Sequence, residues 1–142
     1  MNCTLNTLKE RISEETIKQL TDDENLGIIN QGRVDAAINS AYAKAYSYFA
    51  VRYTVPFAVE PESVTNAVAD VAVKFLYSRK VEKMPEERQS AFDTAIAWFK
   101  DVAKGVATLG VDPAPAATTE GGAETNITTS DRIFTKDSMG GF

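Results

Sequence analysis

The chain of 142 residues contains no histidine and a single cysteine, Cys3. Without an imidazole it lacks the commonest general base, the commonest metal ligand and every histidine-dependent triad. One cysteine cannot form an internal disulfide, and we interpret Cys3 as a small buried residue rather than a nucleophile. We therefore expect no enzymatic activity, no metal site and no cofactor.

Long apolar runs and basic segments are also missing. No run of about 18 apolar residues is present to cross a membrane, and the first residues do not show the basic and apolar regions of a signal peptide. The net charge of −5 argues against sequence-independent DNA binding, which needs a basic face. An acidic wall is still compatible with a protein that encloses DNA without binding it. We expect no membrane association and folding in a reducing cytoplasm.

Apolar residues repeat at helical spacing over the first 110 residues. Thr4 and Ser13 are placed as N-caps of two short helices that reach Ile12 and Leu20. Three longer helices are expected from Val34 to about Tyr53, from Pro61 to about Lys80, and from Pro85 to a stop at Gly110. Strand-like character is confined to residues 50–56 and 127–135. The sequence predicts an all-α fold, a small antiparallel bundle of two short N-terminal helices and three long ones.

Two groups of acidic residues resemble sites of chemistry. Asp70 could be a catalytic carboxylate, but Lys74 follows it by one helical turn and favours an ordinary ion pair. The run Asp22-Asp23-Glu24 lacks the alternating ligands and the glycine position of a calcium loop, so we interpret it as a solvated turn.

The third helix carries more aromatic side chains than one buried face can hold. Tyr42, Tyr46 and Tyr48 do not share a face, which predicts that at least one of them contacts a neighbouring subunit. Trp98, on the last helix, is either an edge-of-core residue or an interface anchor, since tryptophan is enriched at interface hot spots. Both interpretations of Trp98 stay open at this point.

The composition divides the chain into a helical body, residues 1–110, and a linker with an extended C-terminal docking tail, residues 111–142. The linker is rich in Pro, Ala, Thr and Gly, the usual composition of a frayed end. Apolar residues then return, which indicates a segment that lies on another chain. The predicted docking residues are Arg132, Ile133, Phe134, Met139, Gly140, Gly141 and Phe142.

Several stretches, taken in order, resemble a family of tailed-phage and prophage proteins typified by a Mu-like prophage protein. They are residues 3–12, 20–23, 34–38, 52–56, 98–105 and 132–142. The family is similar to the head–tail connector, or adaptor, proteins of long-tailed phages. The resemblance implies a subunit of a homo-oligomeric ring, commonly a dodecamer, whose tail docks on the portal protein.

The same resemblance implies a location in the virion neck, between capsid and tail, after assembly in the host cytoplasm. A stopper or tail-terminator protein would lie below the ring, and DNA would pass through its lumen without sequence-specific binding. Two rival functions are weighed against this one. A small helical phage regulator that binds DNA would need a basic recognition helix, and a carboxylate-based hydrolase would need convergent acids around Asp70. The sequence displays neither feature.

Overall fold

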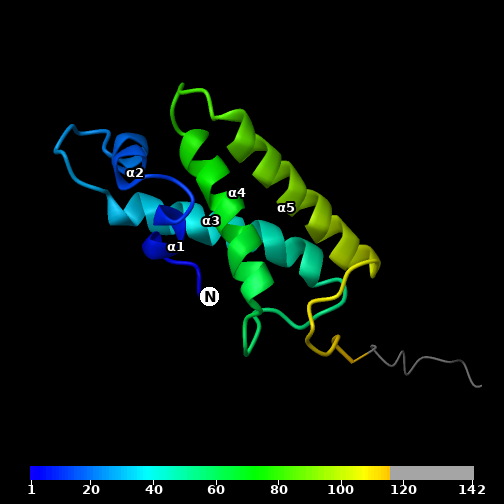
Figure 1. Ribbon diagram of the computed structural model, residues 1–142. Coiled ribbons are helices and arrows are strands. Elements are labelled where there is room, and N and C mark those ends of the chain that lie inside the picture. Colours follow the sequence, from blue (N-terminus) through cyan, green and yellow to red (C-terminus); the bar gives the residue numbers. More distant parts are fainter. Residues whose placement is uncertain (116–142) are drawn as a thin grey trace, which may run out of the picture.

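The computed structural model describes residues 1–115, and Figure 1 shows that they form helices joined by short loops. The five helices are α1 (Leu5–Lys9), α2 (Glu14–Thr21), α3 (Gln31–Phe49), α4 (Glu62–Tyr77) and α5 (Glu86–Lys104). The predicted all-α fold of two short and three long helices is therefore confirmed. Within residues 1–115 no strand forms, so the strand-like character expected for residues 50–56 is wrong. Residues 127–135 lie outside the described part of the chain.

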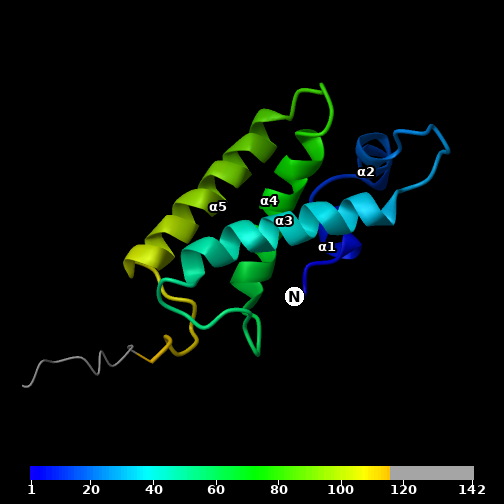
Figure 2. The same cartoon turned by 180° about the vertical axis from the view of Figure 1, so that it is seen from behind.

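Helix α4 is the centre of the fold, because every other helix packs against it. Eight of its residues are buried, and they occur on several faces of the helix rather than on one stripe. Figures 1 and 2 show that α5 runs antiparallel beside α4, whereas α3 crosses this pair at an angle. The expected antiparallel arrangement thus holds for α4 and α5 but not for α3.

The N-terminal ends of the helices agree with the local sequence. The Ser13 hydroxyl accepts a hydrogen bond from the backbone N–H of Thr16 at 3.1 Å, as expected of an N-cap. Helix α3 begins three residues earlier than predicted, because Asn30 Oδ1 accepts from the backbone N–H of Arg33 at 3.2 Å. Both α4 and α5 begin directly after a proline, at Pro61 and Pro85.

The last helix ends earlier than the sequence suggested. Gly105, with a φ of 81°, takes the left-handed conformation that closes α5, so the stop is Gly105 and not Gly110. Val106 consequently lies outside the helix and is 76% exposed rather than part of the core. The chain then turns back along the segment after α3, where the backbone N–H of Ala114 donates to the Arg52 carbonyl at 2.8 Å.

Candidate interaction surfaces

The three tyrosines of α3 lie in different environments. Tyr42 is completely buried, and its hydroxyl donates to the buried Glu60 carboxylate. The same oxygen accepts the backbone N–H groups of Asn2 and Cys3 at 2.9 and 3.0 Å. A side chain with no exposed surface cannot contact a neighbouring subunit. The structure therefore removes Tyr42 from the predicted interface and makes it a core residue.

Glu60 is a buried carboxylate with several polar partners, and the sequence analysis did not identify it. Its Oε1 also accepts from the Thr65 hydroxyl at 2.8 Å, and its Oε2 lies 3.1 Å from the Met1 ammonium. Burial opposes the ionisation of Glu60, but these hydrogen bonds outweigh burial and hold its pKa below the usual value. Its position directly before a helix-starting proline was the only sequence signal, and that signal does not reveal the partners.

Tyr46 and Tyr48 are only partly buried, so both keep surface for a partner. The Tyr46 ring packs between Tyr42 and Phe57, at centroid distances of 5.5 and 6.0 Å. Its hydroxyl is buried without a hydrogen-bond partner among the described residues, and burial together with the nearby Glu60 charge raises its pKa. The assignment of Tyr46 and Tyr48 to a subunit interface stays a prediction.

Trp98 of α5 is partly buried and lies at the edge of the core. Its ring meets Phe49 edge to face at a centroid distance of 5.8 Å and a plane angle of 78°. The same ring closes one end of a cavity of about 400 Å³ between α4 and α5. Small residues form the floor of this cavity, among them Ala67, Ala91 and Ala95. The edge-of-core interpretation is confirmed, and the interface role of Trp98 stays a prediction.

The two acidic groups singled out in the sequence are structural. Asp70 pairs with Arg11 of α1, whose Nε lies 3.2 Å from Asp70 Oδ1, so the predicted pair with Lys74 is wrong. Lys74 instead donates to Gln89 Oε1 across the α4–α5 contact at 2.9 Å. Local spacing favours the i,i+4 pair, but tertiary packing brings a better-placed guanidinium to the carboxylate.

Asp23 is more than a solvated turn. Its carboxylate contacts Arg79 and Lys80 at 2.7 Å and Arg33 at 3.1 Å. These hydrogen bonds, led by the one from Lys80, hold the Asp23 pKa below its ordinary value. The carboxylate therefore ties the loop after α2 to both α3 and α4. Its neighbour Asp22 accepts the backbone N–H groups of Leu26 and Gly27, which shapes the same loop.

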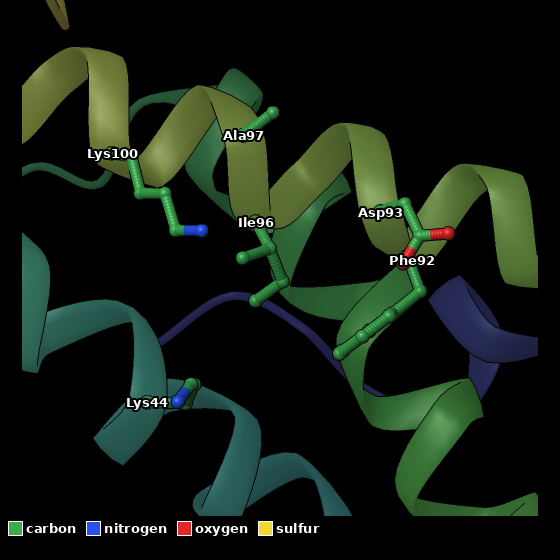
Figure 3. A pocket seen from close by; sticks show the side chains of 6 residues that line it. All are labelled: Lys44, Phe92, Asp93, Ile96, Ala97 and Lys100. Carbon is green, nitrogen blue, oxygen red and sulfur yellow. The ribbon is translucent and has the colours of Figure 1, made fainter.

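A trough lies between α3 and α5 on the surface of the body. Figure 3 shows Phe92, Ile96 and Lys100 extending from α5 into the space that faces α3, with Lys44 on the opposite side. The Asp93 carboxylate points away from this space. The volume of the trough is about 360 Å³. We call it the α3–α5 trough, defined by Lys44, Phe92, Asp93, Ile96, Ala97 and Lys100.

A second depression continues along α3. It lies between α3 and α4, and Ser40, at its edge, precedes Lys44 by one helical turn. Phe75 of α4 is partly exposed in it, between the side chains of Arg33 and Arg79. Each of the two depressions combines apolar side chains with cationic ones. We call this second site the α3–α4 depression.

Both ends of α4 are flanked by loops that display exposed aliphatic side chains. Leu26 and Ile28 come from the loop before α3, and Val81 comes from the loop after α4. These two loops line one common depression through Gly27 and Lys80. At the other end, which Figure 1 shows where α5 stops, the exposed side chains belong to Val51, Val59 and Val106.

Within residues 1–115 no group of three or more His, Cys, Asp or Glu side chains is placed to hold a metal ion. Burial and the Glu60 charge raise the pKa of the Cys3 thiol to about 11, which keeps it protonated and unreactive. No helix in this part of the chain combines the length and apolar character of a membrane span. The predicted docking residues Arg132 to Phe142 lie outside the described residues.

One comparison with known proteins gives a match. A family model described as "Bacteriophage Mu, Gp36" matches residues 2–127, which is most of the chain and includes all five helices. No curated protein matches the chain.

Proposed function

We propose a structural role in the virion for this chain, which belongs to the bacteriophage Mu Gp36 family. In this proposal the protein is a subunit of the head–tail connector, or adaptor, ring. It bridges the portal to the stopper or tail and surrounds the channel through which DNA leaves the head. It is located in the virion neck and, during assembly, in the host cytoplasm.

The observation that carries the proposal is the separation between the core and the apolar C-terminal residues. Leu109 is the last buried residue of the described chain, and every buried residue of the described core lies between Cys3 and Leu109. Ile133, Phe134, Met139 and Phe142 come after the body. An apolar segment that the core does not need is suited to a partner surface, here the portal.

Assembly in this proposal depends on many weak contacts. Burial of one phenylalanine contributes about 1.5–3 kcal/mol, from which the ordering of the segment must be subtracted. A single tail therefore binds weakly. A ring presents one such segment for each subunit, and multivalency raises the overall affinity without any new contact.

The exposed parts of Tyr46, Tyr48 and Trp98 are the proposed subunit contacts within the ring. The Tyr48 ring lies tilted against Phe99 at a centroid distance of 6.0 Å, and Lys44 Nζ lies over the Tyr48 ring, 5.6 Å from its centroid. Aromatic rings held in this way lose little side-chain entropy on binding. The acidic net charge of the chain agrees with a channel wall that does not retain DNA.

The proposal is tested by locating the protein in purified phage particles. A cryo-electron microscopy map of the neck should contain a ring whose subunits fit the helices of Figure 1, between the portal and the tail. Mass spectrometry of the same particles should detect the chain. Particles that carry a complete neck without this protein would contradict the proposal.

A further inference from the structure

Apolar side chains of the α3–α5 trough stay partly exposed, although Lys74 of α4 lies over the Phe92 ring with its Nζ 5.9 Å from the ring centroid. Phe92 and Ile96 are only partly buried there, and α3 turns no large apolar side chain toward them at this point. Lys44 and Lys100 are exposed on the two sides of the trough, and neither has an ion-pair partner within the described residues. An apolar floor between unpaired ammonium groups is complementary to a segment that combines apolar and acidic side chains.

The chain itself contains such a segment. Residues 120–134 carry three carboxylates, Glu120, Glu124 and Asp131, and one guanidinium, Arg132, so their net charge is −2. They also contain Ile127, Ile133 and Phe134. Charge and apolar character therefore both match the trough.

The described chain ends close to the open end of the trough. Ala114 is hydrogen-bonded to Arg52, just beyond the end of α3 at Phe49. From there Lys44 lies roughly 8 Å back along α3, at about 1.5 Å per residue. Lys100 is likewise one turn from the end of α5 at Lys104. Residues 116–120 span up to about 17 Å when extended, which is enough to bring residue 120 to the trough of the same subunit.

We propose that residues 120–134 dock in the α3–α5 trough of their own chain in the unassembled subunit. Ile133 and Phe134 cover Phe92 and Ile96, and the carboxylates of the segment face Lys44 and Lys100. The α3–α4 depression, one turn further along α3, takes any apolar side chain that reaches beyond the trough. Docking in this way covers the apolar surface of the trough and of the segment until a partner protein binds the segment in place of the trough.

The proposal is tested by paramagnetic relaxation in the full-length protein. A nitroxide is attached at Ser130→Cys in a chain that also carries Cys3→Ala, so that it has one reactive thiol. The linker gives the segment an effective concentration of about 1 mM at the trough, at which even a weak intramolecular contact is populated. We therefore expect the amide signals of Phe92, Ile96 and Lys100 to lose about half of their intensity or more. The amides of α2, which packs against α3 and α4 away from α5, should keep theirs.

Two controls make the result specific. Lys44→Glu with Lys100→Glu should restore the trough signals. Lys18→Glu with Lys83→Glu, which changes the net charge equally on α2 and on the loop after α4, should not. The second control tests for docking between chains. Isotope-labelled chains without a nitroxide are mixed with nitroxide-labelled chains without isotope, and the amide signals should lose no intensity. A loss confined to that mixture would mean that the segment docks on another subunit and would overturn the proposal.

A second measurement leaves Cys3 unchanged. Ile133→Ser with Phe134→Ser should shift the amide signals of the trough in the otherwise native chain, and the matched pair Met139→Ser with Phe142→Ser should not. Equal small effects of both pairs, or relaxation spread evenly over the body, would contradict docking. Neither experiment contains a portal protein, so the failure of this proposal and the failure of the connector role are separate results.

Discussion

The hydroxyl of Tyr42 donates a hydrogen bond to the carboxylate of Glu60 inside the protein, while it accepts the backbone N–H groups of Asn2 and Cys3. One phenol thus connects the start of the chain, the middle of α3 and the residue before α4. Thr65 and the Met1 ammonium complete the set of groups around the carboxylate. This network fixes the N-terminal segment on the long helices.

Tyr42→Phe should destabilise the body. The substitution leaves two backbone N–H groups without an acceptor and takes one donor from Glu60, and an unsatisfied buried polar group costs about 1–3 kcal/mol. We expect a loss of that size in the free energy of unfolding, measured by urea denaturation. Tyr48→Phe is the matched control, because Tyr48 is a partly exposed tyrosine on the same helix. Equal losses for the two variants would contradict the network.

Glu60 should make stability fall at acidic pH. Its pKa is lower in the folded protein than its ordinary value near 4.5, so its contribution is present above that value and is lost as the pH falls through the folded pKa. Glu60→Gln should be less stable than the native chain at pH 7, and the difference should shrink as the pH drops below about 4.5. Glu62→Gln, at an exposed neighbouring position, should show no such convergence. A pH-independent difference for Glu60→Gln would exclude this linkage.

Gly105→Ala should destabilise the end of α5 through two separable effects. The left-handed conformation costs a non-glycine residue about 1–2 kcal/mol, and a Cβ at this position would lie 2.5 Å from Arg52 Nη1. Gly110 has a φ of 71° but no atom within 4 Å of its Cβ position, so Gly110→Ala isolates the conformational effect. We expect Gly105→Ala to lower the thermal stability more than Gly110→Ala does. This difference between the two variants should disappear when Arg52 is also replaced by Ala. Equal losses at the two glycines would show that Arg52 moves aside freely.

The body should fold without the C-terminal segment. Every buried residue of the described core lies between Cys3 and Leu109, and the last described hydrogen bond to the body comes from Ala114. A chain that ends at Pro115 should therefore keep a cooperative thermal transition and the helical circular dichroism of the full-length protein. Loss of the cooperative transition would show that residues after Pro115 belong to the core.

Helical periodicity predicted the fold well, but the sequence did not reveal the polar partners. Apolar spacing and proline placement identify α4 and α5, because both signals depend on residues that are close in sequence. Most partners of Asp70, Asp23 and Glu60 come from other parts of the chain, so spacing along one helix suggested the wrong partner for Asp70. Tyr42 was assigned to an interface for a related reason: the groups that surround its hydroxyl, Glu60 and the backbone of Asn2 and Cys3, are distant from it in the sequence.

The surfaces were less predictable than the core. Trp98 and the partly exposed Phe92 and Ile96 look like ordinary members of an apolar stripe in the sequence. Only the divergence of α3 from α5 leaves Phe92 and Ile96 open between two lysines. That angle is a property of the packed helices and has no signal in the spacing of residues.

The connector role is tested most directly by capture of the portal protein. Immobilised portal is incubated with the full-length chain, with a chain truncated after Asn126, and with Phe134→Ala plus Phe142→Ala. Val81→Ser, at an exposed position at the other end of the body, is the control variant. The connector account predicts capture of the full-length and Val81→Ser chains, and strongly reduced capture of the other two. Equal capture of all four would contradict docking by the tail and would assign portal binding to the helical body, and capture of none of them would contradict the connector role.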